Sequence, residues 1–438
     1  MKNILLQLRE KLQTSVWFIP SILCGASLLL ALSIHLIERQ IALHTLFPVF
    51  DNLTMSVTSA RNVLGIVAGS VLSVGGVVFS VTMVALTLTS GQYGPKILRQ
   101  FLSDEDSKIS LGMFLGTSLY CLVVMAGYTD ADRPSISVGV ALLLTIFALA
   151  SFIRFIHRTA TDLQADQIIE RIGGELHESL DRLTSTGALT GRTTDTQGWR
   201  QRARGSRPAL IAAPRTGYVQ TIDYPAVISW CLERRCVAQL RARAGDFLMQ
   251  GTCLLKLYDC QRDLSEDELD SLCAHIRTGP MRTPVQDPEY PITQLNQLAA
   301  RALSPGINDP GTAVTCIDWY SMALARIVDR ELPGKVFLDA KGAPVLLARY
   351  TDFPGLAKAF YAPARQFARS NIPVLIALLE SLVRLAELTT RGDRLKQLRL
   401  QGNHLGDIVE EGAHLEFDLR GFRQRYRKLM RLASRFDR

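Results

Sequence analysis

Four long apolar stretches occupy the first part of the chain, and they constrain its fold more than any other feature. Each is close to or above the roughly 20 residues that a helix needs to cross the hydrocarbon core of a bilayer. No comparable stretch follows, so a large C-terminal region is predicted to lie in water. The sequence therefore predicts an α-helical integral membrane protein with four spans at about residues 16–37, 63–89, 111–126 and 136–156, within a transmembrane domain at 1–158.

Basic residues near the span ends predict the orientation, because lysine and arginine resist translocation. Lys2, Arg9 and Lys11 precede the first span, and further basic residues lie between the second and third spans and after the fourth. An even number of spans puts both ends of the chain on the same side. We therefore expect a multi-pass protein with cytoplasmic N- and C-termini.

The second span carries a narrow stripe of small and hydroxylated side chains. At about 100° per residue, the stripe follows one face while valine and leucine cover most of the remainder. Part of it is a G-x-x-x-G spacing, which lets two helix backbones approach closely in lipid. Packing against a neighbouring span or a second subunit is the favoured interpretation, and a pore lining in an oligomer is the alternative. The stripe consists of Asn62, Gly65, Gly69, Ser73, Gly76, Ser80 and Thr87.

The interiors of the predicted spans contain no Asp, Glu, Lys or Arg. Proton-coupled pumps and antiporters use ionisable groups inside the membrane, so the sequence argues against both. A passive pore, or no transport at all, remains compatible with it.

The water-exposed region is predicted to be α+β and to have three parts. Residues 159–208 indicate a juxtamembrane helix and a linker, and 209–262 contain short, turn-bounded strands. Two halves of this β module, beginning at Arg215 and Ala244, resemble the small barrel of biotinyl and lipoyl domains but lack a lysine at a hairpin tip. We interpret it as an interaction or oligomerisation module. The helical remainder is 263–438, with helices predicted at 292–303, 313–330, 354–368, 373–388, 394–411 and 414–435.

The densest polar cluster comprises Arg282, Asp287, Arg301, Asn308 and Asp309. Asp309 followed by proline has the pattern of a helix N-cap with proline at the first helical position. The functional alternative gathers Arg282, Arg301, Asn308 and the free N–H groups of that helix into an anion site. Capping is the favoured interpretation for Asp309, whereas both interpretations stay open for the arginines.

The last predicted helix is two-faced, with apolar side chains on one side and basic ones on the other. A solvated surface is the usual reason for a basic face, and contact with anionic lipid is the second interpretation. Nucleic acid is not expected, because no aromatic stacking platform accompanies the charge. The basic residues are Arg420, Arg423, Arg427, Lys428, Arg431 and Arg435.

Metal and cofactor sites are not indicated. None of the eight cysteines forms a C-x-x-C pair, and no histidine pair has the i, i+4 spacing of a helical metal site. The chain contains no G-x-S-x-G, H-E-x-x-H or Walker A sequence, so an enzyme is the less favoured class.

Several motifs resemble a bacterial family of predicted inner-membrane proteins, domain of unknown function 2254. They include the second-span segment from Gly69 to Ser80, Gly112 to Tyr120, Gly217-Tyr-Val-Gln, Gly245-Asp-Phe, Arg282-Thr with Gln286-Asp-Pro, and Arg301-Ala-Leu-Ser-Pro-Gly-Ile-Asn-Asp-Pro. The family pattern has an aromatic residue after Pro310, where this chain has Gly311. The resemblance implies an inner-membrane location and this topology, and the family carries no established activity.

Two functional hypotheses follow. The first is a homo-oligomeric, channel-like or transport-related protein with the second span at the symmetry axis and a cytoplasmic domain that regulates or assembles it. The second is a membrane-anchored sensor or scaffold that binds an anionic ligand or protein partner through the cluster around Arg282 and Arg301.

Overall fold

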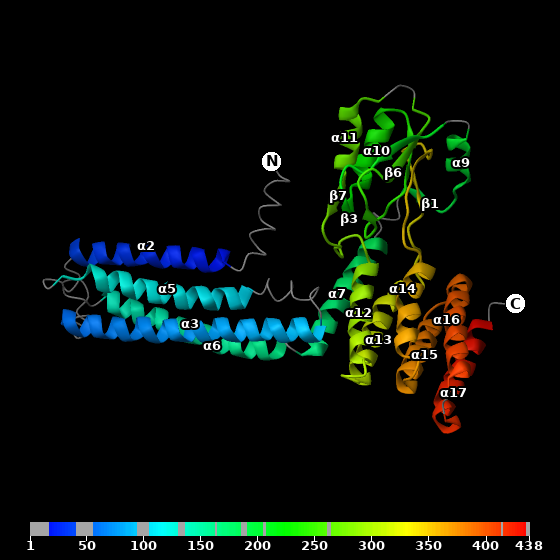
Figure 1. Ribbon diagram of the computed structural model, residues 1–438. Coiled ribbons are helices and arrows are strands. Elements are labelled where there is room, and N and C mark those ends of the chain that lie inside the picture. Colours follow the sequence, from blue (N-terminus) through cyan, green and yellow to red (C-terminus); the bar gives the residue numbers. More distant parts are fainter. Residues whose placement is uncertain are drawn as a thin grey trace. The chain divides into compact units, whose positions relative to one another are not determined.

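The computed structural model describes residues 17–40, 56–93, 105–129, 136–162, 164–184, 191–204, 207–260, 264–412 and 415–434 (Figure 1). They form two compact units, residues 1–167 and 168–438. The basic residues that predict the orientation before the first span lie outside the described residues.

The first unit is a bundle of four apolar helices, each long enough to cross a membrane. Four candidate membrane-spanning helices therefore lie where the four spans are predicted. Each helix is longer than its predicted span at one end or both. Polar residues at the ends continue the helical hydrogen bonding past the apolar stretch. The helices are α2 (Phe18–Gln40), α3 (Val57–Tyr93), α5 (Glu105–Gly127) and α6 (Ile136–Asp162).

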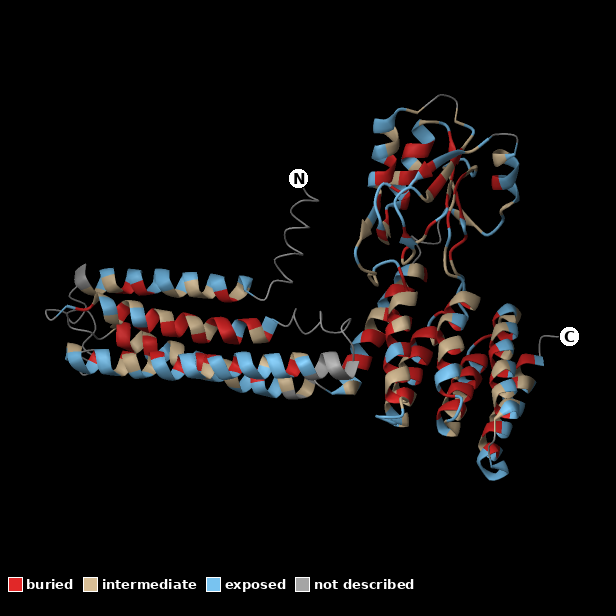
Figure 2. Ribbon diagram, in the orientation of Figure 1, coloured by how far each residue is buried: buried red, intermediate tan, exposed pale blue. Residues whose placement is uncertain are grey.

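Helix α5 is the most buried of the four, with 56% of its apolar window inside the bundle (Figure 2). Two of its glycines lie directly against α2. A Cβ at Gly112 would lie 2.6 Å from Leu23 Cδ1, and one at Gly116 would lie 2.6 Å from Ser27 Oγ. The G-x-x-x-G spacing in α5 therefore serves close packing inside one subunit.

Charged groups of the bundle lie near the helix ends. Arg154 Nη2 lies 2.9 Å from Asp106 Oδ1, and Arg158 also pairs with Asp106. At the start of α6, Ser137 donates from its backbone N–H and its hydroxyl to Glu38, at 2.9 and 2.7 Å. The ionisable side chains therefore connect neighbouring helices at their ends.

The second unit begins with α7 (Ala165–Thr184), which is part of the folded helical region rather than a free juxtamembrane segment. Its face of Ile168, Ile169, Ile172 and Leu176 is buried. A Cβ at Gly173 would lie 2.5 Å from the Trp319 ring of α13, so the two helices pack closely.

Helices α12 to α17 lie where the six helices of the C-terminal part are predicted and run side by side (Figure 1), although strands β7, β8 and β9 also fall within 263–438. Several begin with a polar cap and have proline at the first or second helical position, as after Asp309, Asp352 and Asn371. Their bounds are α12 (Glu289–Ala302), α13 (Pro310–Ala325), α14 (Phe353–Phe367), α15 (Ile372–Glu387), α16 (Gly392–Glu411) and α17 (Glu416–Ala433).

The strands form two open sheets. The larger has six strands in the order β1-β8-β9-β4-β6-β2, and its only parallel pair among the described residues is β4 with β9. The smaller has the order β5-β3-β7. The strands are β1 (Arg192–Thr193), β2 (Ala209–Ala212), β3 (Gly217–Ile222), β4 (Val237–Leu240), β5 (Phe247–Leu248), β6 (Cys253–Tyr258), β7 (Ile276–Gly279), β8 (Val336–Leu338) and β9 (Pro344–Leu347).

The prediction of a barrel-like module at 209–262 is wrong, because the strands do not close into a barrel. Strands β3 and β5 of the two supposed halves do pair, with Tyr218 opposite Phe247. The remaining strands instead extend a sheet with β1, β8 and β9, which come from outside the predicted module. Because β4 pairs with β9, β4 and β6 lie inside an open sheet, and no closed barrel forms among the described strands.

Short helices accompany the sheets, and one core unites them. They are α9 (Gln197–Ala203), α10 (Tyr224–Glu233) and α11 (Glu266–Ala274). Buried side chains from both sheets and from α10 and α11 form a single hydrophobic cluster, including Val219, Val227, Leu255, Leu272 and Leu346. The predicted linker and helical part thus contribute strands to one α/β region.

Candidate functional site

Most of the predicted stripe on α3 faces away from the other described helices of its own bundle, except at Gly65, whose Cβ position lies 3.9 Å from Met125 Sδ of α5. Asn62, Gly69, Ser73, Gly76, Ser80 and Thr87 are exposed, and Gly65 is half-buried. A Cβ at Gly69 or Gly76 would meet nothing within 4 Å. The buried face of α3 is formed instead by Leu64, Ala68, Val71, Gly75 and Val78.

Two hydroxyls of this stripe are satisfied within α3. Ser73 donates to the carbonyl of Gly69 at 2.9 Å, and Thr87 donates to that of Met83 at 2.8 Å. Such bonds to the preceding turn remove the cost of placing a hydroxyl in an apolar environment. These two side chains therefore suit a helix contact as well as a wetted surface.

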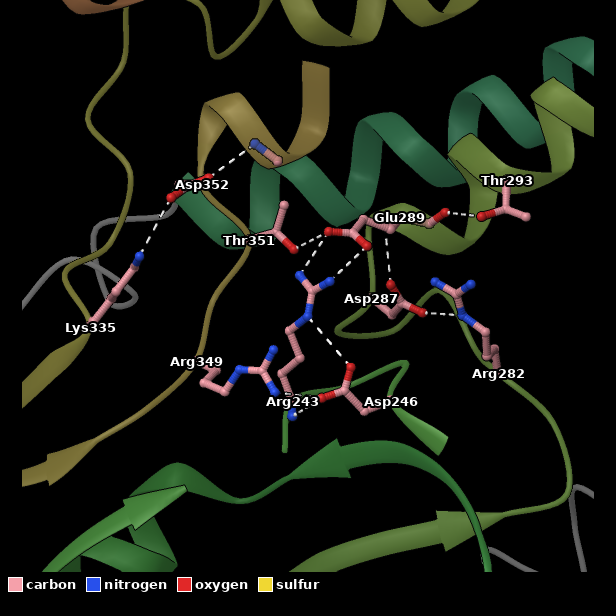
Figure 3. A network of polar contacts seen from close by, with 11 residues as sticks. Arg243, Asp246, Arg282, Asp287, Glu289, Thr293, Lys335, Arg349, Thr351 and Asp352 are labelled. Atoms are coloured by element: carbon pink, nitrogen blue, oxygen red, sulfur yellow. Dashed lines mark hydrogen bonds and ion pairs between the residues drawn. The ribbon is translucent and has the colours of Figure 1, made fainter. Parts of the chain in front are cut away.

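The Arg282–Asp287 pair lies just before α12 in the second unit (Figure 3). Arg282 Nε donates to Asp287 Oδ2 at 2.7 Å, and the Glu289 N–H donates to Asp287 Oδ1 at 3.1 Å. The carboxylate is buried, with 4% of its side chain exposed. Burial raises the pKa of Asp287 above its ordinary value, against the lowering effect of the hydrogen bond from Arg282.

A second ion pair connects the β region to α12. Arg243 forms a two-bond contact with Glu289, at 2.7 and 2.8 Å, and Thr351 donates to the same carboxylate at 2.5 Å. Arg349 lies 3.3 Å from Asp246, which also accepts from the Arg243 N–H. Figure 3 shows these side chains converging from three separate chain segments.

Gly245 lets the β region approach Asp287. Its φ is +92°, and a Cβ there would lie 2.3 Å from Asp287 Oδ2. Gln286 adds a further link, since its amide accepts from the Ile222 N–H at 2.9 Å and donates to the Ile222 carbonyl at 3.1 Å. The Gly245-Asp-Phe and Gln286-Asp-Pro motifs thus meet in one network that joins the β and helical regions.

The structure does not bring the predicted anion cluster together. Asp287 precedes α12 and Arg301 lies in its last turn, so the 14 residues of the helix separate them by roughly 20 Å. Arg282 is held at the first end by Asp287. Asn308, at a φ of +48°, and Asp309 belong to the loop at the other end.

Asp309 is the N-cap of α13, as the favoured interpretation predicts. It accepts from the Thr312 N–H at 3.1 Å and from the Thr312 hydroxyl at 2.5 Å. These hydrogen bonds lower the pKa of the Asp309 carboxyl. Arg301 is half-buried, and its guanidinium has no partner among the described residues.

The basic face of α17 is exposed opposite a buried face of Leu419, Phe422, Leu429 and Ala433. Lys428 Nζ lies 2.6 Å from Glu387 Oε1 of α15, and Arg423 pairs with Glu416. Arg435 lies outside the described residues. Contact of this face with anionic lipid stays a prediction.

A cavity of about 680 Å³ lies in the second unit beside the polar network of Arg243, Glu289 and Thr351. Its wall includes β1, the segment 331–335, the Asp352 cap of α14 and the first turn of α16. Thr351 contacts Glu289 while the adjacent Asp352 lies 3.4 Å from Lys335 Nζ, so network and cavity share this segment. The volume falls within the range of small-molecule sites.

Four basic side chains line the cavity: Arg192, Lys335, Arg391 and Arg394. Sequence reasoning missed them, because Arg192 lies in the predicted linker, Lys335 precedes a short strand, and Arg391 and Arg394 resemble ordinary surface charges at the start of a helix. No spacing in the sequence marks residues that only the tertiary fold brings to one cavity.

The sequence comparisons agree with this architecture. A family model described as Predicted membrane protein (DUF2254) matches residues 13–384. The chain belongs to this family. This confirms the resemblance, and membership in DUF2254 assigns it to predicted membrane proteins of unknown function.

Mycobacterial relatives of this DUF2254 protein carry no functional description. Uncharacterized protein MT1328 of Mycobacterium tuberculosis is 27% identical over 391 residues, which cover 86% of this chain and 73% of the relative. Uncharacterized protein Mb1321c of Mycobacterium bovis matches with the same identity and coverage. No solved structure matches the chain.

Proposed function

We propose that this protein is a homo-oligomer of the bacterial inner membrane with channel-like or transport-related activity, and that the α3 stripe forms the contact between subunits. One observation carries the proposal: the bundle leaves the small, hydroxylated face of its longest helix uncovered. Gly69 and Gly76 have open space beyond them, which a second helix backbone can occupy.

The same face supports a passive pathway at the subunit contact. Ser80 is exposed and its hydroxyl has no partner among the described residues, so it is free to interact with water or a neighbouring subunit. Charged groups are near helix ends in the described bundle. A pathway lined by hydroxyls and free of buried charge conducts without coupling to protonation.

Cysteine cross-linking tests the contact at fixed membrane depth. Ser80 and Val81 are adjacent and both exposed, but they point about 100° apart. Under mild oxidation in membranes, Ser80→Cys should form a cross-linked dimer and Val81→Cys should not, with wild-type protein reporting any background from native cysteines. Equal cross-linking of both variants would contradict a contact through the stripe.

Planar-bilayer recording tests conduction. Gly76→Leu places a bulky side chain in the stripe, whereas Val77→Leu adds one methylene at the neighbouring position, which already carries an exposed aliphatic side chain. Wild-type protein and Val77→Leu should pass ions, and Gly76→Leu should change the conductance. Silent wild-type bilayers under varied voltage and lipid composition would contradict channel activity without affecting the cross-linking result.

The proposal places both termini in the cytoplasm, as the distribution of lysine and arginine predicts. Alkaline phosphatase fused after Arg438 folds to an active enzyme only outside the cytoplasm, so the fusion should be inactive in cells. A fusion placed in the loop between α5 and α6 should be active. The reverse pattern would overturn the orientation.

A membrane-anchored sensor or scaffold is the second candidate function. The cavity beside the Arg243–Glu289 network favours it, because it offers a site for an anionic ligand in the C-terminal unit. The basic face of α17 would add contact with anionic lipid or a protein partner. In this alternative the spans serve as an anchor and a dimer contact.

A further inference from the structure

We propose that the cavity lined by Arg192, Lys335, Arg391 and Arg394 is a binding site for a phosphate monoester. The proposal deepens the sensor alternative by naming a site and a ligand class, and it does not depend on ion conduction. The site is separate from the predicted cluster at Arg282 and Arg301. It is assembled entirely within the second unit.

Arg394 provides the main observation. The residue is only 6% exposed; its Nη2 donates to the Arg330 carbonyl at 3.5 Å, but its Nε has no hydrogen-bond partner. Its guanidinium lies over the Phe353 ring at 4.5 Å, and its Nε is 3.7 Å from Asp393 Oδ2, too far for a hydrogen bond. A buried guanidinium with an unused N–H favours an acceptor in the cavity.

Arg192 repeats this arrangement on β1. Its guanidinium lies 4.1 Å from the centre of the Phe337 ring and 4.9 Å from that of Tyr350. Its Nη1 is buried and has no hydrogen-bond partner. Two arginines from distant parts of the chain therefore present unused N–H groups while lining the same cavity.

The first turn of α16 adds a third source of positive potential. Arg391 is the N-cap of this 20-residue helix, and no side chain of its own caps the turn. Backbone N–H groups at a helix N-terminus favour an anion. With Lys335 on the opposite segment, the cavity combines a helix N-terminus with four cations, which is the chemistry that phosphate binding uses.

Acidic residues in the wall limit the ligand to one that also carries donors. Asp352 and Asp393 already contact Lys335 and Arg391, at 3.4 and 3.3 Å. Glu331 and the hydroxyls of Thr194 and Thr196 remain for the hydroxyl groups of an organic part. The volume of about 680 Å³ greatly exceeds what a phosphate group needs, so the ligand is an ester with a polar body.

Titration calorimetry of the purified full chain in detergent tests the site. The soluble probes are inorganic phosphate, glycerol 3-phosphate and adenosine monophosphate. We expect at least one of the two esters to bind more tightly than inorganic phosphate. Because phosphatidic acid is also a phosphate monoester, thermal denaturation in nanodiscs with and without this lipid tests the lipid source.

The variants separate the cavity from general surface charge. Arg391→Gln and Lys335→Gln change side chains at the cavity rim and should weaken binding at least about tenfold each. Arg394→Gln should abolish binding. Arg369→Gln removes an exposed charge that pairs with Glu411 outside the cavity, and should bind as wild type does.

The results distinguish a soluble ligand from a lipid ligand and test whether the cavity binds either. Binding of a soluble ester that falls in the rim variants supports a soluble ligand, and stabilisation by phosphatidic acid alone supports a lipid ligand. Absence of binding to every probe, or an equal loss in Arg369→Gln, would overturn the proposal. Cross-linking of the Ser80→Cys variant reports the oligomer separately, so failure of one proposal is distinguishable from failure of the other.

Discussion

Gly245 is a residue whose missing side chain lets two parts of the C-terminal unit meet. Its backbone has a positive φ and its Cα faces the Asp287 carboxylate. The sequence contains both residues in recognisable motifs, but nothing in it predicts that they touch, because their contact depends on how the β region folds onto α12. Local patterns reveal such residues without revealing their partners.

Substituting Gly245 tests this contact. Gly245→Ala should lower the free energy of unfolding by about 1–3 kcal/mol through backbone strain. It should lower it further because the new Cβ displaces Asp287 from Arg282. Gly251 also has a positive φ, of +85°, but has no neighbour within 4 Å of its Cβ position. Gly251→Ala therefore reports the strain alone, and an equal loss in both variants would argue against the Asp287 contact.

Asp309 represents the opposite case, since a cap is defined by neighbouring residues and could be predicted. Asp309→Ala should destabilise α13 by about 1 kcal/mol, and Asp309→Asn should retain most of the cap. Thermal denaturation of the purified protein measures both. No loss in the alanine variant would show that the cap contributes nothing.

The cap should also depend on pH. Hydrogen bonds to Thr312 lower the pKa of Asp309 in the folded state, so its ionised form contributes stability above the unfolded pKa. That contribution is lost as the pH falls through the folded pKa, below about pH 4. The stability difference between wild type and Asp309→Asn should therefore be constant near neutrality and change only in acid.

At the scale of elements, the two G-x-x-x-G spacings have different surroundings. Gly112 and Gly116 of α5 are covered by α2, whereas Gly69 of α3 is uncovered. The spacing in α3 predicts close packing but not its partner, because spacing alone does not specify whether the partner lies in the same subunit.

This difference predicts separable effects. Gly112→Leu should cost the bundle about 1–3 kcal/mol by overpacking against Leu23 and Pro20. Gly69→Leu should leave the thermal stability of the subunit nearly unchanged and reduce its self-association. Thermal denaturation, and cross-linking with Ser80→Cys added to each variant, measure the two effects. A matching stability loss in both variants would be inconsistent with an uncovered stripe.

At the scale of the whole molecule, the spans were predictable because their signal is continuous along the chain. The six-stranded sheet was not, because β8 and β9 are short strands far from β2, β4 and β6 in the sequence, and β1 has only two residues. The cavity depends on the same assembly, so its residues could not be grouped in advance.

The division into two units predicts where the chain can be cut. A fragment from Gln164 to Arg438 should be soluble without detergent and unfold cooperatively, because its core lies within the second unit. A fragment beginning at Gly191 lacks α7 and exposes its packing surface around Trp319. It should aggregate or lose its cooperative transition, and equal behaviour of the two fragments would contradict the role of α7.

The pairing of β4 with β9 also affects folding during synthesis, because the two strands are made at different times. When residues 237–240 leave the ribosome, the strand beside them has yet to be made, and it arrives only with residues 344–347. Until then one edge of β4 offers unpaired N–H and C=O groups to any other strand. Nascent chains stalled between these two points should recruit chaperones, and completion of β9 should end that dependence.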